Sequence, residues 1–113
     1  MDREELLRRY AAGERNFIRV HIKEVNLSGS DLKNINLSGA NLIRVNFSFS
    51  DLSGANLKGA NLSKANLATC EMMGVNLENA NTKGARLGTL ESAFIHNTID
   101  PEGMLVDGPI TIE

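Results

Sequence analysis

The chain contains one cysteine, no long apolar run and no strong excess of either charge. Its single cysteine, Cys70, excludes an internal disulfide and any metal site built on a pair of cysteines, and favours a reducing compartment. The formal net charge of -2 gives no general reason to expect binding to nucleic acid or to a membrane surface. Residues 1–12 alternate acids with bases and lack the apolar stretch of a secretory signal. No run approaches the ~18 apolar residues of a membrane span, so we expect a cytoplasmic protein.

What the sequence does have is a repeat of five residues. A large apolar residue, here termed the centre of its unit, recurs at every fifth position from Phe17 to Leu77, and the same spacing continues through Thr82, Leu87 and Ser92. Asn or Asp precedes most centres, and a small or β-branched residue lies two positions before them. Glycine often lies two positions after the centre, where a type II turn needs positive φ.

A period of five fits neither a helix nor a flat strand. Five residues of α-helix advance about 500°, so the centres would spiral around the helix without forming a stripe. In a straight strand, five is odd, so successive centres would point to opposite faces. A chain that runs extended for a few residues and then turns a corner lets every centre point to a common axis. The period therefore predicts an all-β solenoid with the centres and small residues inside.

The segments Ala55–Gly59 and Ala60–Lys64 resemble the A(N/D)LXX consensus of the pentapeptide-repeat family, and the match runs over residues 15–94. The resemblance implies a right-handed quadrilateral parallel β-helix with four units per coil and about four coils. The family is functionally mixed and abundant in cyanobacteria. The resemblance says far less about function than about fold, and the leading hypothesis is a non-catalytic protein-interaction scaffold or regulator, with no cofactor. The alternative is a DNA mimic that binds DNA gyrase or another nucleic-acid-binding protein, although such mimics are longer and more strongly acidic.

Both ends of a coil stack expose backbone groups that need covering. Residues 1–14 are expected to supply a capping helix over 3–12, with Asp2 as its N-cap and Gly13 as its stop. The coils are expected over 15–94, with the register lost after Phe94 and residues 95–113 forming a cap or tail. Turn signals there flank short apolar runs at 104–106 and 110–112. These runs either fold back over the last coil or pair with a second copy, so a monomer and a homodimer through this end both stay open.

With four units per coil, residues twenty apart stack on each other, and the outer surface can be written down. One face is expected to carry a row of acids: Asp31, Asp51, Glu71 and Glu91. The opposite face is expected to carry a row of bases: Lys23, Arg44, Lys64 and Lys83. Either row is a candidate surface for a charged protein partner. The alternative is that Asn and Asp are interchangeable at the position before the centre, so that the acids are there by chance and have no function. Phe49 is expected to point outward as a contact anchor, and Ile18 to lie beneath the helix.

No group of residues suggests catalysis. His21 and His96 lie far apart and have no second ligand at metal-binding spacing. Cys70 occupies a small-residue slot, so it is expected to point inward as a structural thiol. The acids lie on a convex, solvated surface with no cavity that would shift their pKa values. The sequence thus predicts no catalytic residues, no metal and no cofactor.

Overall fold

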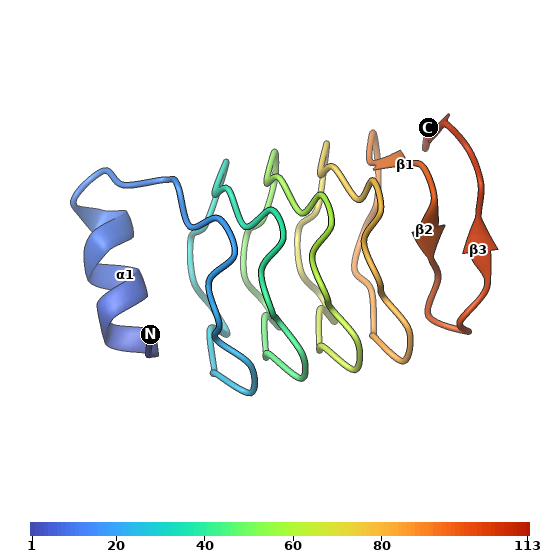
Figure 1. Ribbon diagram of the computed structural model, residues 1–113. Coiled ribbons are helices and arrows are strands. Elements are labelled where there is room, and N and C mark those ends of the chain that lie inside the picture. The colour runs from blue at the N-terminus through green and yellow to red at the C-terminus, as the bar shows by residue number, and fades with distance from the viewer.

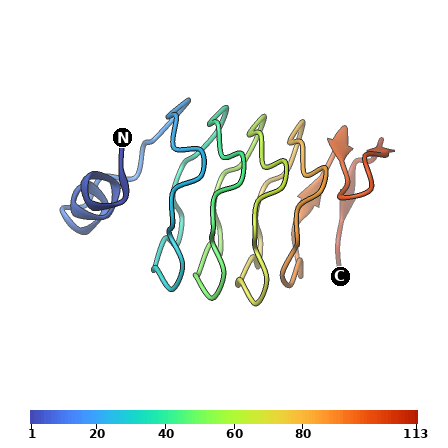
Figure 2. The same ribbon diagram turned by 90° about the horizontal axis from the view of Figure 1, so that it is seen from below.

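A computed structural model describes all 113 residues as an elongated stack of coils between a helix and a terminal cap (Figure 1). The helix α1 spans Arg3–Ala11 at the blue end. At the red end lie β1 (Phe94–Ile95), β2 (Thr98–Ile99), β3 (Leu105–Val106) and β4 (Ile110–Thr111). The coils in between lie side by side in both perpendicular views (Figures 1 and 2). The molecule measures 36 × 23 × 23 Å.

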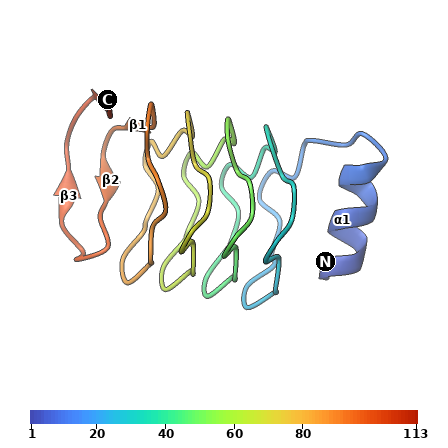
Figure 3. The ribbon, with the colours of Figure 1, turned by 180° about the vertical axis from the view of Figure 1, so that it is seen from behind.

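Parallel backbone pairing joins each coil to the next. Asn36 bridges Asn56, which in turn bridges Asn76, and each of the other three rows has the same twenty-residue offset. The N–H of Leu37 donates to the carbonyl of Asn56 at 2.8 Å, and the N–H of Asn56 donates to the carbonyl of Ile35 at 2.9 Å. Only isolated residues pair in this way within the coils, so no long strand forms. The predicted stacking of residues twenty apart is confirmed for this part of the chain, and the back view shows the same stack (Figure 3).

Each corner is a four-residue turn that begins at a centre. After Leu37, for example, the N–H of Ala40 donates to the Leu37 carbonyl at 3.1 Å, while Gly39 adopts φ +66°. The Oδ1 of Asn36 accepts a hydrogen bond from the N–H of Ser38 at 3.1 Å. The same side-chain bond recurs at most Asn and Asp residues of the rows, which explains why these residue types precede the centres.

The centres and the small residues fill the interior of the stack. Leu37, Leu57 and Leu77 are fully buried, and Ala40 and Ala60 pack beside them. Cys70 also points inward, where its Sγ lies 3.5 Å from Ser50 Oγ. Large and small side chains therefore alternate around a core that leaves little room for a bulkier residue.

The spacing of twenty does not hold to the end of the stack. Glu71 bridges Thr89, Asn76 bridges Phe94, and Asn81 bridges Ile99, each pair eighteen positions apart. The prediction that the register runs unbroken to Ser92 and is lost after Phe94 was wrong on both points. Two turn residues are missing between Leu87 and Thr89, and the pattern then resumes with Leu90 as a centre and Ala93 as a buried small residue.

Gly88 makes this shortened corner possible. A Cβ at this position would lie 2.1 Å from the carbonyl oxygen of Cys70 and 2.9 Å from that of Leu67. Its φ lies outside the left-handed region, so the requirement for glycine is one of space and not of backbone conformation. The chain can shorten this corner by two residues only because Gly88 has no side chain to lie between the two neighbouring stretches of backbone.

The tail folds back over the last coil. β1 pairs with β4 and β2 pairs with β3, both antiparallel, which continues two of the four faces by one more strand. The N–H of Ile112 donates to the Ala93 carbonyl at 3.0 Å, and the Ile112 side chain packs against the core. Met104, Leu105 and Ile110 remain exposed on the outside of this cap.

The helix α1 covers the other end. Asp2 Oδ1 accepts from the N–H of Glu5 at 2.9 Å and so caps the helix, which ends one residue before the predicted position. Leu6 is fully buried against the first coil, and the hydroxyl of Tyr10 donates to the Lys33 carbonyl at 2.7 Å. Ile18 does not lie beneath the helix as predicted, because its side chain is 45% exposed.

Replacing Gly88 with alanine should destabilise the protein by about 1–3 kcal/mol, since the new methyl group collides with backbone and not with a movable side chain. Gly29→Ala is the control, because it introduces a Cβ at φ +67° with no atom within 4 Å. Urea unfolding of both variants measures the difference. A smaller loss for Gly88→Ala than for Gly29→Ala would show that the coils are not this close.

Candidate interaction faces

The acidic row lies on one face of the stack, as predicted for three of its four members. Asp31 bridges Asp51, which bridges Glu71, so the three side chains stand one coil apart. The fourth position belongs to Thr89. Glu91, predicted to complete the row, lies instead in the turn after Leu90, because the shortened corner moves it two places along the coil. We use the term acidic face for Asp31, Asp51 and Glu71.

A lysine that the sequence analysis did not single out lies against this face. Lys33 Nζ lies 3.6 Å from Asp31 Oδ2 and 3.7 Å from Asp51 Oδ2, so it links two coils. Burial raises the pKa of Asp51, but hydrogen bonds from Ser53 and the charge of Lys33 lower it more, and the net pKa lies below its ordinary value. Asp51 is therefore ionised at neutral pH. Glu71, in contrast to Asp31 and Asp51, has no cation within ion-pair distance.

Exposed apolar side chains flank the acidic face on both sides. Phe49 lies in the corner before Asp51 and is 71% exposed, as predicted. Its φ of +61° falls in the left-handed region, which costs a residue with a Cβ about 1–2 kcal/mol. Met73 lies in the corner after Glu71 and is 54% exposed. Acids bordered by accessible apolar groups form a surface that suits a basic and partly apolar partner.

The predicted basic row forms a continuous corner on the opposite side. The N–H of Arg44 donates to the Ser63 carbonyl and the N–H of Lys64 donates to the Lys83 carbonyl, so successive corners are joined coil to coil. The four cations are exposed and form no ion pair. We use the term basic corner for Lys23, Arg44, Lys64 and Lys83. Glu24 is the one acid among these turn positions.

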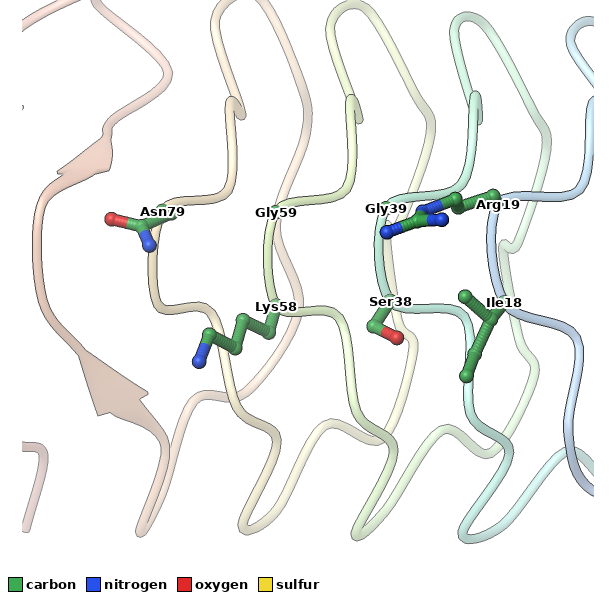
Figure 4. Close-up of a pocket in the computed structure, with 7 residues that line it drawn as sticks. All are labelled: Ile18, Arg19, Ser38, Gly39, Lys58, Gly59 and Asn79. Carbon is green, nitrogen blue, oxygen red and sulfur yellow. The ribbon is translucent and has the colours of Figure 1, made fainter.

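A shallow groove of about 260 Å³ runs along the corner that precedes the basic corner in each coil (Figure 4). Gly39 and Gly59 form its floor, and the Arg19 side chain lies across Gly39, where a Cβ would come within 3.1 Å of Arg19 Cγ. Lys58 projects from the next coil toward the coil that carries Asn79. Ile18 and Ser38 complete the lining of this corner groove. Arg19 has no ion-pair partner, so the groove holds an uncompensated positive charge.

Glu78 connects the groove to the terminal cap. Its Oε2 lies 3.0 Å from His96 Nδ1 and its Oε1 lies 3.4 Å from Lys58 Nζ. The hydrogen bond with His96, with smaller contributions from Lys58, lowers the pKa of Glu78 below its ordinary value. The five-residue period does not predict this cluster, because the eighteen-residue offset that brings His96 beside Glu78 starts at the shortened corner.

The remaining reactive groups are dispersed. No three His, Cys, Asp or Glu side chains are placed to hold a metal ion, and His21 and His96 lie on different coils. Burial raises the pKa of the Cys70 thiol, so it stays protonated and unreactive inside the core. No helix of the structure has the length and apolarity that crossing a membrane requires. The surface offers rows of charge and amide groups, which are suited to binding.

Comparison with known proteins gives a family match and structural relatives. The family model for pentapeptide repeats matches residues 21–59 and 50–88, with eight copies. No curated protein gave a significant sequence match. HetL, a pentapeptide repeat protein involved in heterocyst differentiation regulation in the cyanobacterium Nostoc sp. strain PCC 7120, has a TM-score of 0.76 and 31% identity over 87% of this chain.

A second solved structure comes from a plant. AT2G44920, a pentapeptide repeat protein of the Arabidopsis thaliana thylakoid lumen, has a TM-score of 0.71 and 28% identity over 74% of this chain. QnrB1, a plasmid-mediated fluoroquinolone resistance protein, reaches a TM-score of only 0.45 with 19% identity. The chain spans 44% of the length of HetL and 59% of that of the Arabidopsis protein.

Replacing Glu78 with glutamine should weaken the dependence of stability on acid pH. Because its folded-state pKa lies below the ordinary value of 4.5, the Glu78 carboxylate stabilises the fold above that pH and loses this effect as the pH falls through the folded pKa. The variant should therefore lose less stability than wild type between pH 7 and about pH 3, as measured by urea unfolding. An unchanged loss in Glu78→Gln would contradict the cluster.

Proposed function

Because the chain belongs to the pentapeptide-repeat protein family, we propose that it is a non-catalytic scaffold that binds another protein through the acidic face. The observation that carries the proposal is the exposed Phe49, which lies beside the aligned Asp51 and Glu71. An aromatic side chain exposed in this way contributes nothing to the core, whereas a partner protein could bury it as an anchor.

The regulatory involvement stated for HetL supports a role of this kind, since HetL shares 31% identity with this chain. The chain spans less than half the length of HetL, so a regulatory role does not follow from the similarity by itself, and we propose it for this chain. We also propose a right-handed quadrilateral coil, a cytoplasmic location, and function without a cofactor. Met104, Leu105 and Ile110, exposed on the terminal cap, favour the homodimer over the monomer.

The alternative of a DNA mimic has weaker support. A mimic of the phosphate backbone needs a long run of negative charge, whereas the acidic face has three carboxylates in its row and Lys33 is bound to two of them. QnrB1, the relative that would favour this reading, is too distant to argue for it.

Neutralising the acidic face should abolish partner binding. We expect the variant Asp31→Asn/Asp51→Asn/Glu71→Gln to lose a protein that the wild type captures from host lysate, since Asn already occupies the same slot in the other rows and the fold should be kept. The control is Glu4→Gln/Glu24→Gln/Glu102→Gln, which removes three exposed acids outside the acidic face with the same change in net charge and should retain that protein. Retention of the captured protein by the acidic-face variant would overturn the proposal.

Replacing Phe49 with glycine should raise stability while weakening binding of that same partner. Relief of the left-handed conformation, less the greater chain entropy of glycine, leaves a gain of about 0.5–1 kcal/mol. Thr69→Gly is a matched control, because Thr69 stands one coil further along the same corner at φ +56°. Urea unfolding should show both variants stabilised, and only Phe49→Gly should lose affinity in a titration with the captured partner. Equal affinity for the two variants would exclude Phe49 as an anchor.

A further inference from the structure

Between the corner groove and the basic corner lies a row of side-chain amides. Asn41, Asn61 and Asn81 bridge one another coil to coil, and each follows a groove corner and precedes a basic corner along the chain. We use the term amide row for these three residues. Three successive coils therefore present an amide with turn residues of both corners on either side, whereas the first coil has His21 in this slot. The groove, the amide row and the basic corner form one continuous face.

The amide row has hydrogen-bond donors that are not used within the protein. Each Oδ1 accepts a backbone N–H within its own corner: from Ile43 at 3.3 Å for Asn41, from Ser63 at 3.1 Å for Asn61, and from Lys83 at 3.0 Å for Asn81. These bonds hold the oxygens toward the turns and do not use the NH₂ groups. None of the three Nδ2 atoms donates a hydrogen bond within the protein. The row thus offers donors whose acceptors must come from outside or from water.

Cations line both sides of this row of donors. Arg19 and Lys58 lie along the corner groove, and the basic corner supplies four more. Of these six, only Lys58 has a carboxylate partner, Glu78. Donors in the middle and positive charge at both edges are the complement of a ligand that carries carbonyl oxygens along its length and carboxylates on its side chains.

We propose that this face binds an extended acidic segment of a partner protein. The corner groove reaches from Arg19 to Asn79, three coil spacings or about 14 Å at ~4.8 Å each, which about five residues of extended chain would cover. Main-chain carbonyls of the segment accept hydrogen bonds from the amide row. Its carboxylates lie against Arg19 on one side and against the basic corner on the other.

Protein fits this face better than nucleic acid does. Single-stranded nucleic acid is held largely by stacking of its bases on aromatic side chains. No phenylalanine or tyrosine is exposed on the amide row or at its two corners, because Phe17, which begins a groove corner, is buried. The net charge of -2 and the acidic face on the opposite side also work against attraction of a long polyanion. A short acidic segment is attracted by the local cations and meets less of the opposing charge.

The sharpest test changes amides to acids without changing the fold. Asp31 and Asp51 occupy the same slot in another row and make the same bonds to backbone N–H groups, so Asn41→Asp/Asn61→Asp should fold as wild type does. The matched control is Asn46→Asp/Asn66→Asp in the neighbouring row, with the same change in net charge. Fluorescence anisotropy with a labelled (Glu-Ser)₄ peptide measures binding, with (Gln-Ser)₄ and a single-stranded oligonucleotide as comparison ligands.

We expect the acidic peptide to bind wild type and the control, to bind Asn41→Asp/Asn61→Asp about tenfold more weakly, and to weaken with added salt. The neutral peptide should not bind. Arg44→Gln/Lys64→Gln/Lys83→Gln should show the same loss without an added acid. Equal binding by the two double variants, or no binding of the acidic peptide at low salt, would overturn the proposal. Tighter binding of the oligonucleotide, lost in the same variants, would make the face a nucleic-acid site instead.

Discussion

The structure depends on one interaction, the backbone ladder that joins each coil to the next. In every full coil, the N–H of a centre such as Leu57 donates to the carbonyl one coil further on, that of Asn76. This bond fixes which residues stack, and the stacking decides which side chains meet in the core and which form rows outside. The five-residue period of the sequence follows from this ladder. Each coil must pass through the same four corners, with one unit per corner, for its backbone to pair with the next coil.

The ladder also explains which residues could be placed correctly from the sequence and which could not. Asp31, Asp51 and Glu71 were correctly placed in one row because twenty residues separate successive members. Glu91 was misplaced because register follows hydrogen bonding and not counting, and the chain omits two turn residues at Gly88. A signal was present in the sequence: Leu90 and Ala93 are suited to a centre and a small slot, which Ser92 as a centre is not.

Contacts between long side chains could not be foreseen in the same way. Period and spacing place Cα positions, whereas Lys33 reaches two acids and Arg19 lies across Gly39 through side-chain conformations that the repeat does not determine. The charge on the two opposite faces is a property of the rows and was predicted. The groove and the unused amide donors are properties of how side chains and turns fill the corners, and they emerge only from the structure.

Amide hydrogen exchange across the shortened corner tests this account most directly. The N–H groups of Phe94 and Ile99 donate to the carbonyls of Val75 and Ala80, both at 2.9 Å, on the far side of Gly88. If the ladder continues with an offset of eighteen, both amides should be protected as strongly as that of Asn76, which donates to Ala55 in a full coil. Exchange of Phe94 and Ile99 at the rate of exposed amides would show that the coils end before this corner, and would contradict the account.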